Sequence, residues 1–337
     1  MNADTLKQLT ARANLKSLDG MTVAVLGLGA QGHAHALNLR DSGVRVVVAQ
    51  RNGSPRYQLA VESGFEPVEI EQAVRVADVL VFALPDEAAP SVYEQHIAGV
   101  LRPGQTLGFL HGFSIHYKQI VPPPNVDVVL LAPKAQGQAV RGEYVAGRGV
   151  AALVAVHQDA TGHALETALG WAAGIGAGRS AVFETTFADE TETDLFGEQA
   201  VLCGGLTALI KAGFETLVEA GYPPELAYFE CCHEVKLVVD LIYEGGLTFM
   251  RERISNTARF GDLTRGSRII GPEARAAMRA VLDEIRSGRF ADDWAEENRC
   301  GRQRFRELTE RDRVHAIERV GERIRHLMRG GPVADET

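Results

Sequence analysis

The sequence has little of what exported and nucleic-acid-binding proteins usually carry. Only four of its 337 residues are cysteine, namely Cys203, Cys231, Cys232 and Cys300, and none has CxxC spacing. A disulfide framework is unusual at this length, so we expect reduced, buried thiols. The 35 Lys and Arg residues are outnumbered by 44 Asp and Glu, and the net charge of −9 argues against nucleic acid as the main ligand.

Membrane and export signals are also lacking. The longest continuous apolar runs, such as Val150–Val156, are as long as a strand and far short of the roughly 20 residues that cross a bilayer. The first ten residues are polar and lack the basic and then apolar layout of a signal peptide. We therefore expect a cytoplasmic protein without a membrane partner. With 45% hydrophobic residues, the chain has enough apolar surface for about two folded domains.

The first half of the chain alternates between short β-branched runs and helix-like stretches. Buried strands are predicted at Thr22–Leu26, Val44–Val48, Val79–Ala83, Thr106–Leu110, Val126–Leu131 and Val150–Val156. Helices are predicted at Gln31–Asp41, Tyr57–Ser63 and Glu69–Val76. The alternation predicts an α/β domain over residues 1–183, built on a parallel sheet with helices on both faces.

After about Phe183 the pattern becomes helical throughout. Long periodic segments are predicted at Thr193–Ala220, Pro224–Glu244, Thr248–Thr257, Pro272–Ser287 and Ala291–Thr309. We therefore expect an all-α domain over residues 184–328, followed by a frayed tail over 329–337.

A glycine-rich loop joins the first predicted strand to the first predicted helix. Residues 27–32 read G-L-G-A-Q-G, a G-x-G-x-x-G pattern, and the next strand follows at βαβ distance. The glycines permit a tight turn and close approach of a pyrophosphate, which the helix N-terminus attracts. The loop predicts a Rossmann-type dinucleotide site; a glycine-rich turn without a ligand is the alternative.

The residues after the second predicted strand favour NADP over NAD. NAD sites usually place Asp or Glu there to bind the ribose 2′-hydroxyl, whereas residues 50–56 read Q-R-N-G-S-P-R. Arg51, Ser54 and Arg56 can bind a 2′-phosphate, which a carboxylate would repel. A solvated basic loop is the alternative.

Two pairs of carboxylates stand out in the helical half. Asp194 and Glu198 have i, i+4 spacing, as do Glu230 and Glu234. Their segments are otherwise apolar and place no Lys or Arg between the paired residues, so a divalent cation is a suitable counter-charge. Four carboxylates on two facing helices can hold two Mg²⁺ ions, although the spacing alone fits exposed acidic faces equally well.

Two further residues have positions that suit catalysis. His111 and Lys134 follow predicted strands, at the sheet edge where open α/β sheets bind ligands. A histidine there can act as an acid or a base or can orient a substrate oxygen. A structural loop histidine is the alternative.

Several of these segments together resemble the ketol-acid reductoisomerase family in its short-chain (class I) form. The segments are GAQGHAHALNLRDSG at 29–43, LPDE at 84–87, HGFSIH at 111–116, ETETDLFGEQ at 190–199, ECCHE at 230–234, YEGG at 243–246 and ISNTA at 254–258. The resemblance runs from about Leu15 to Met328.

The resemblance implies a two-step reaction in valine and isoleucine biosynthesis. A small-molecule substrate, 2-acetolactate or 2-aceto-2-hydroxybutyrate, undergoes an Mg²⁺-dependent alkyl shift. NADPH then reduces the resulting 2-keto acid to a 2,3-dihydroxy acid. The resemblance also implies a helical domain that is knotted, or entwined between two subunits. The smallest active unit is then a homodimer with shared active sites, which can build a larger assembly.

The resemblance also implies residue roles. Asp194, Glu198, Glu230 and Glu234 match the ligands of two Mg²⁺ ions, with Asp194 bridging and the two glutamates at 230 and 234 contributed by the partner subunit. Ser255 matches the residue that binds the substrate carboxylate, His111 the active-site histidine, and Lys134 a lysine near the metal-bound water. The implied cofactor-binding residues are Gly27, Leu28, Gly29, Ala30, Gln31, Gly32, Arg51, Ser54, Arg56, Asp86, Glu87, Ala88, Ala89 and Gly137.

The chain departs from the family pattern at a few positions. Ala30 replaces the serine usual in the glycine-rich loop, Arg56 stands where many members have serine, and residues 135–138 differ from the common G-P-G-H. These departures leave the cofactor preference and the substrate range open, but they remove no metal ligand.

Three other functions stay open at this point. A paralogue would perform the same chemistry on another 2-hydroxy-3-keto acid. A metal-independent NADP-linked β-hydroxyacid dehydrogenase would need no paired carboxylate helices. A non-catalytic NADP sensor would need the glycine-rich loop and Arg51, but neither the four carboxylates nor His111 and Lys134.

Overall fold

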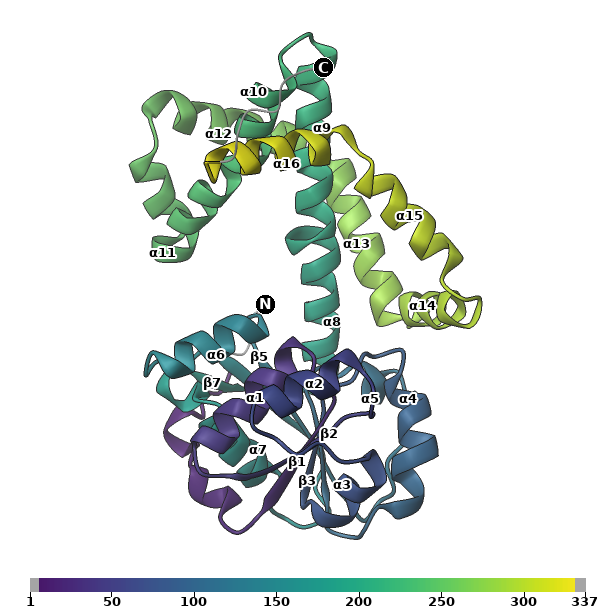
Figure 1. The fold of residues 1–337 in the computed structure, drawn as a ribbon. Helices are drawn as coiled ribbons and strands as arrows, with labels where there is room; N and C mark the ends of the chain where they lie inside the picture. The colour runs from purple at the N-terminus through teal and green to yellow at the C-terminus, as the bar shows by residue number, and fades with distance from the viewer. Residues whose placement is uncertain (1–5, 331–337) are drawn as a thin grey trace. The chain divides into compact units, whose positions relative to one another are not determined.

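The computed structural model describes residues 6–330 and divides the chain into two compact units, residues 1–193 and 194–337 (Figure 1). The division falls between Thr193 and Asp194, inside helix α8 (Phe187–Gly197), so this helix contributes to both units. Most of the tail predicted at 329–337 lies outside the described residues.

The N-terminal unit contains a seven-stranded sheet in the order β2-β1-β3-β4-β5-β6-β7. The strands are β1 (Thr22–Leu26), β2 (Arg45–Ala49), β3 (Val79–Phe82), β4 (Thr106–Phe109), β5 (Asp127–Pro133), β6 (Ala152–Gln158) and β7 (Val182–Glu184). All six predicted strands are present, with ends within two residues of the prediction. The prediction missed β7, which has only three residues.

The prediction of a parallel sheet is correct for the first five strands and wrong for β6 and β7. β6 pairs antiparallel with β5, and β7 runs parallel to β6. A strand that runs parallel to β5 would need a connection that returns the chain to the opposite end of the strands. The chain makes no such return here, because the end of β5 at Pro133 pairs directly with the start of β6 at Ala152.

Helices cover both faces of this sheet. Side chains of β1 alternate between the faces: Val23 and Val25 join one core cluster and Ala24 and Leu26 join the other. The α-helices are α1 (Ala30–Asp41), α2 (Pro55–Glu62), α3 (Ile70–Val76), α4 (Ala89–Val92), α5 (Phe113–His116), α6 (Gly137–Val145) and α7 (Ala164–Gly174). Shorter 3₁₀ or π turns lie at Thr10–Arg12, Leu15–Leu18, Tyr93–Ile97, Ala98–Val100 and Ala177–Arg179.

The strand order places a ligand crevice beside β1. β1 lies between β2 and β3, so the connections from β1 and from β2 leave the sheet in opposite directions. Doubly wound sheets bind ligands outside the carboxyl ends of the strands at such a point. The glycine-rich loop follows β1 directly and therefore lies at this crevice.

Two histidines of α1 serve packing. His35 is fully buried, and its Nδ1 accepts a hydrogen bond from Trp171 Nε1 of α7 at 3.0 Å. Burial lowers the pKa of His35 to about 3, so the ring is neutral and anchors α1 to α7. His33 Nε2 lies 2.9 Å from Ser63 Oγ, next to the C-terminus of α2.

The second unit is helical throughout its described residues, as predicted. After α8 come α9 (Gly204–Glu219), α10 (Pro224–Tyr228), α11 (Val235–Arg253), α12 (Asn256–Ile269), α13 (Pro272–Arg286), α14 (Arg289–Arg299), α15 (Gln303–Arg313) and α16 (Ala316–Met328). Two π-helical turns, η6 (Glu198–Leu202) and η7 (Phe229–His233), interrupt segments that the periodicity predicted as continuous. α12 and α16 were not predicted.

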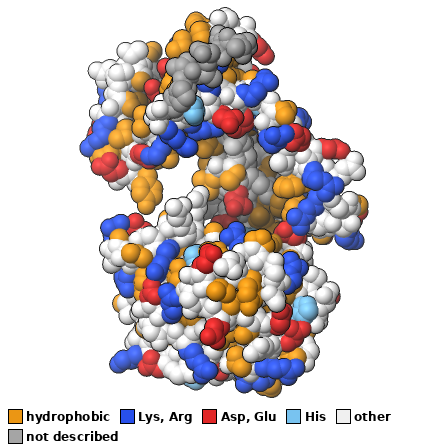
Figure 2. Space-filling view, in the orientation of Figure 1, with side chains coloured by type: hydrophobic (Ala, Val, Ile, Leu, Met, Phe, Trp, Pro, Cys, Tyr) orange, Lys and Arg blue, Asp and Glu red, His pale blue; other side chains and the backbone are white. Residues whose placement is uncertain are grey.

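This unit has a small core and a large exposed apolar surface. Phe214, Tyr228 and Ile324 are buried together, and a side chain at Gly321 would lie 2.5 Å from the Tyr228 ring. Large hydrophobic side chains nevertheless reach the surface, as Figure 2 shows. They include Val201, Leu202, Leu209, Leu226, Leu237, Val239, Tyr243, Leu247, Phe260, Leu263 and Ile269.

The prediction that the four cysteines are buried is wrong. Cys203 and Cys300 are exposed, and Cys231 and Cys232 are half-buried. All four belong to the helical unit, whose small core leaves few positions for fully buried thiols. The four are free thiols, as expected.

Candidate active site

The glycine-rich loop has a backbone that other residues cannot adopt. Gly27 has φ +92°, a left-handed conformation, and a Cβ atom there would lie 2.7 Å from the Ala83 carbonyl oxygen. A Cβ atom at Gly32 would lie 2.3 Å from the Gly27 carbonyl oxygen. These contacts hold the N-terminus of α1 close to the end of β1, where its free N–H groups can bind phosphate.

A cavity of about 580 Å³ lies over this loop and is formed entirely by the N-terminal unit. Its wall runs from Arg56 on α2, past the loop, to His111 and Ser114. Nine of the predicted cofactor-binding residues line it: Gly27, Leu28, Gly29, Ala30, Gln31, Gly32, Arg56, Asp86 and Ala89. Five others, Arg51, Ser54, Glu87, Ala88 and Gly137, lie outside the lining that the structure describes.

Gln50 takes the place of the acidic residue of an NAD site. Its Oε1 accepts a hydrogen bond from the Leu28 backbone N–H at 3.2 Å, and its Nε2 donates to Ser54 Oγ at 2.9 Å. Ser54 Oγ also accepts from the Tyr57 N–H and caps α2. The end of β2 is therefore a neutral hydrogen-bonded bridge, beside which Arg56 supplies the positive charge in the cavity wall.

At the other end of the cavity, one buried glutamate accepts hydrogen bonds from three donors. Glu190, on the first turns of α8, is 1% exposed at its side chain. Its Oε2 accepts from His111 Nδ1 at 3.0 Å and from the Gly112 N–H at 3.1 Å, while its Oε1 accepts from Lys134 Nζ at 3.1 Å. His111 follows β4 and Lys134 follows β5, so the carboxyl ends of two strands and α8 converge here.

The surroundings keep Glu190 ionised. Burial raises the pKa of this carboxyl, but the hydrogen bond from His111, the charges of His111 and Lys134 and the Gly112 N–H together lower it below its usual value. An ionised carboxylate only accepts hydrogen bonds, so Nδ1 of His111 carries a proton. Glu190 thereby fixes the orientation of the imidazole and attracts the lysine ammonium.

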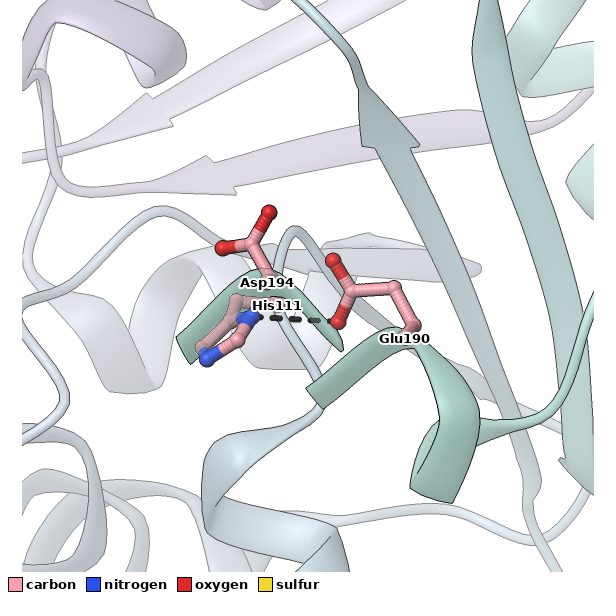
Figure 3. A group of neighbouring side chains, drawn as sticks. All are labelled: His111, Glu190 and Asp194. Atoms are coloured by element: carbon pink, nitrogen blue, oxygen red, sulfur yellow. Dashed lines mark hydrogen bonds and ion pairs between the residues drawn. The ribbon is translucent and has the colours of Figure 1, made fainter. Parts of the chain in front are cut away.

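Asp194 lies one helical turn beyond Glu190 on α8. One ligand atom each from His111, Glu190 and Asp194 lie within 4.8 Å of one another. Figure 3 shows the two carboxylates and the imidazole, with the hydrogen bond between His111 and Glu190 dashed. Asp194 contributes carboxylate oxygens to this group, and a hard cation prefers oxygen ligands.

The other predicted metal ligands adjoin the two π-helical turns. Glu198 opens η6, and Glu230 and Glu234 lie within and just after η7. All three are exposed in a single chain, whereas Asp194 is half-buried. π-Helical turns inside α-helices occur frequently at functional sites. Ser255 is exposed at the N-cap of α12, where its Oγ accepts from the Ala258 N–H at 3.1 Å.

Glu190 was missing from the predicted site residues, although the sequence contained a signal for it. It precedes Asp194 by four residues, as Asp194 precedes Glu198, so the i, i+4 pattern that singled out the acidic pairs continues to Glu190. The contacts with His111 and Lys134 depend on tertiary packing and are not visible in that spacing.

Comparison with known families decides the assignment. Residues 17–181 match the family described as "Acetohydroxy acid isomeroreductase, NADPH-binding domain". Residues 187–330 match the family described as "Ketol-acid reductoisomerase, C-terminal domain". The chain belongs to the ketol-acid reductoisomerase family. As a member, it is an isomeroreductase of branched-chain amino-acid biosynthesis that binds a nicotinamide cofactor.

Solved structures agree with this assignment. An NADH-preferring ketol-acid reductoisomerase from an uncultured archean is 46% identical, with a TM-score of 0.91, over 94% of this chain and 97% of that one. An NAD-binding semialdehyde dehydrogenase protein from Cupriavidus necator, solved with calcium and NAD, is 20% identical, with a TM-score of 0.60, over 79% of this chain and 99% of that one. The second likeness concerns the fold alone.

Proposed function

We propose that this ketol-acid reductoisomerase converts 2-acetolactate and 2-aceto-2-hydroxybutyrate into 2,3-dihydroxy-3-methyl carboxylic acids, with Mg²⁺ and NADPH. The observation that carries the proposal is the cluster of Glu190, His111 and Lys134 at the end of the dinucleotide cavity, with Asp194 one turn away. A simple dehydrogenase has no need of a second carboxylate beside its acid–base group.

NADPH fits the cavity wall better than NADH. The glycine-rich loop suits a pyrophosphate, neutral Gln50 stands where an NAD site offers a carboxylate, and Arg56 offers a guanidinium in the same cavity wall. The preference proposed here differs from that of the archaeal relative, whose name states that it prefers NADH. Bound NADPH supplies the hydride and Mg²⁺ supplies Lewis acidity at the substrate oxygens.

The chain's own carboxylates suit Mg²⁺, and among the described residues one chain brings two of them together at Asp194. Mg²⁺ favours oxygen ligands, and both oxygens of the other carboxylate, Glu190, already accept hydrogen bonds. We therefore assign Asp194 and Glu198 of one subunit, and the glutamates at 230 and 234 of its partner, as the ligands of two ions.

Lys134, Glu190 and His111 suit the proton transfers. The alkyl shift removes a proton from the hydroxyl of one substrate carbon and returns one to the oxygen of the next. Lys134 can donate a proton to the second oxygen, because its hydrogen bond to Glu190 holds the ammonium in place, and His111 faces the same end of the cavity. Ser255, at the N-terminus of the fourteen-residue helix α12, suits the substrate carboxylate.

A second copy of the chain explains the apolar surface of the helical unit. By length and composition, one continuous helical stretch, Phe187–Glu219, could cross a membrane; glycine, threonine and charged residues interrupt its apolar runs in the sequence. Its first turns carry Asp189, Glu190 and Glu192, which are costly in a bilayer. We therefore propose that the exposed apolar side chains form the interface of an entwined homodimer, which completes the metal site. The cytoplasmic location remains a prediction.

The function is tested by NADPH oxidation with 2-acetolactate, with and without Mg²⁺. The wild type is expected to turn over only with Mg²⁺, and Glu230→Gln to lose at least about 10²-fold in kcat, because a Mg²⁺ ligand is removed. Glu219→Gln, an exposed glutamate at the end of α9, is the matched control and is expected to behave as wild type. Appreciable turnover in EDTA would reject the metal-dependent mechanism, and turnover of bulkier 2-hydroxy-3-keto acids alone would favour a paralogous substrate.

Arg56 is expected to determine the preference for NADPH. Arg56→Ala should lower kcat/KM for NADPH about 10- to 100-fold, because a charge-assisted hydrogen bond contributes about 1.5–3 kcal/mol, and should leave kcat/KM for NADH within about twofold. Arg45→Ala, an exposed arginine at the opposite end of β2, is the control. Equal losses with both cofactors would show that Arg56 acts on the shared part of the dinucleotide.

A further inference from the structure

The side chain of Gln31 reaches out of the glycine-rich loop to the turn that carries Lys134. Its Nε2 donates a hydrogen bond to the carbonyl oxygen of Ala135 at 2.8 Å, across 104 positions of the sequence. A carbonyl oxygen can only accept, so this contact also fixes which end of the amide faces the turn. The expected role of Gln31 was cofactor contact alone.

The same turn positions the lysine of the acid–base cluster. Lys134 donates through its backbone N–H to the Ala151 carbonyl at 2.8 Å, and its Nζ reaches Glu190 Oε1 at 3.1 Å. A lysine side chain is long and flexible, so the place of its ammonium depends on where the backbone holds its Cα atom.

The two ends of the turn are fixed by other contacts, and its middle is held by Gln31. At the α6 end, a Cβ atom on Gly137 would lie 2.2 Å from the Ala30 carbonyl oxygen, so α6 packs directly on the glycine-rich loop. Buried Asn38 of α1 donates to the Val140 carbonyl of α6 and strengthens that packing. Ala135 lies between Lys134 and this packed end, and Gln31 binds its carbonyl.

We propose that Gln31 is a positioning residue, which holds Lys134 toward Glu190 through the carbonyl of Ala135. It thereby ties the turn of the acid–base cluster to the loop that binds the cofactor phosphates. The inference deepens the proposed function, because it rests on the role assigned there to Lys134.

The test is a double-mutant cycle with Gln31→Met and Lys134→Met. Gln31→Met keeps the length of the side chain and removes its donor. We expect kcat with 2-acetolactate to fall about tenfold while the Kd of NADPH, from fluorescence titration, stays within about twofold. Lys134→Met should lose more, and adding Gln31→Met to it should cause no further loss, because the two residues act as one unit.

Two further variants keep the outcome decisive. Gln31→Leu also lacks a donor and adds no charge beside the cofactor phosphates, so it should reproduce the fall in kcat if Gln31→Met folds poorly. Gln136→Met, an exposed side chain of the same turn, should match wild type.

Two results would contradict the positioning role of Gln31 alone, and a third would also refute the proposed role of Lys134. Losses that add up in the double variant, or a Kd for NADPH that rises as far as kcat falls, would overturn the positioning role and leave that of Lys134 intact. Unchanged turnover in Lys134→Met alone would refute the proposed role of Lys134, and the inference with it.

Discussion

Replacing Glu190 by glutamine is expected to lower kcat by about 10²- to 10⁴-fold and the free energy of unfolding by about 3 kcal/mol. Both carboxylate oxygens accept from N–H donors, Oε2 from His111 and Gly112 and Oε1 from Lys134. An amide has one oxygen, so in either orientation its NH₂ group faces a donor. In one orientation the variant removes the acceptor of the buried Gly112 N–H and of His111, in the other it removes the acceptor that Lys134 has in Glu190, and in both it removes the negative charge beside Lys134.

The loss should be confined to chemistry and stability. The dinucleotide cavity does not include Glu190 in its lining, so we expect the Kd of NADPH to change by less than about threefold. Asp189→Asn, the exposed neighbour on the same turn of α8, controls for a general effect of removing charge there. If Glu190→Gln kept wild-type turnover with normal stability, the cluster of His111, Lys134 and Glu190 would have no part in the reaction. Chemical denaturation and steady-state NADPH oxidation supply the two measurements.

Four strands of the N-terminal unit, β1, β3, β4 and β5, were predictable because they are buried on both faces. β1, for example, is buried at every position and apolar after Thr22, and the residues at its two ends mark its limits. The direction of β6 was not predictable, because a run of valine and alanine has the same composition whether it runs parallel or antiparallel to its neighbour. That direction depends on the path of the chain between Pro133 and Ala152.

The helical unit was predictable as a class but not in its details. Apolar periodicity identifies helices, yet a π-helical turn adds one residue per turn and leaves the composition unchanged. Two such turns adjoin the carboxylates Glu198 and Glu230, where the spacing argument assumed regular α-helix. The exposed apolar side chains of this unit also weaken the periodic signal, because they face away from the small core around Phe214 and Tyr228.

The candidate site was predictable where chemistry depends on local pattern. The glycine-rich loop and Asp194 are visible in spacing alone. The partner of Lys134 and the contact of Gln31 are not, because they join residues that lie 56 and 104 positions apart. The family resemblance implied that Lys134 lies near the metal, whereas its hydrogen bond with Glu190 is visible only in the structure.

Co-expression of two inactive variants is expected to recover about a quarter of wild-type activity, if Asp194 of one subunit and Glu230 of the other form one site. Asp194→Asn and Glu230→Gln should each be inactive alone. In a mixed dimer, one site combines both changes and the other contains neither, so one of two sites works. Random pairing makes half of the dimers mixed, which gives the quarter. Co-expression with two affinity tags allows the mixed dimer to be purified, where the expected recovery is about half.

A second pair of variants separates shared sites from other causes of recovery. Asp194→Asn mixed with Glu198→Gln should stay inactive, because both residues lie on the same helical stretch, Phe187–Glu219, and each site of the mixed dimer then carries one change. If all four carboxylates of a site came from one chain, neither mixture would recover. If the chain worked as a monomer, tagged copies would not purify together. Recovery by the first mixture alone would show that a second chain completes each site.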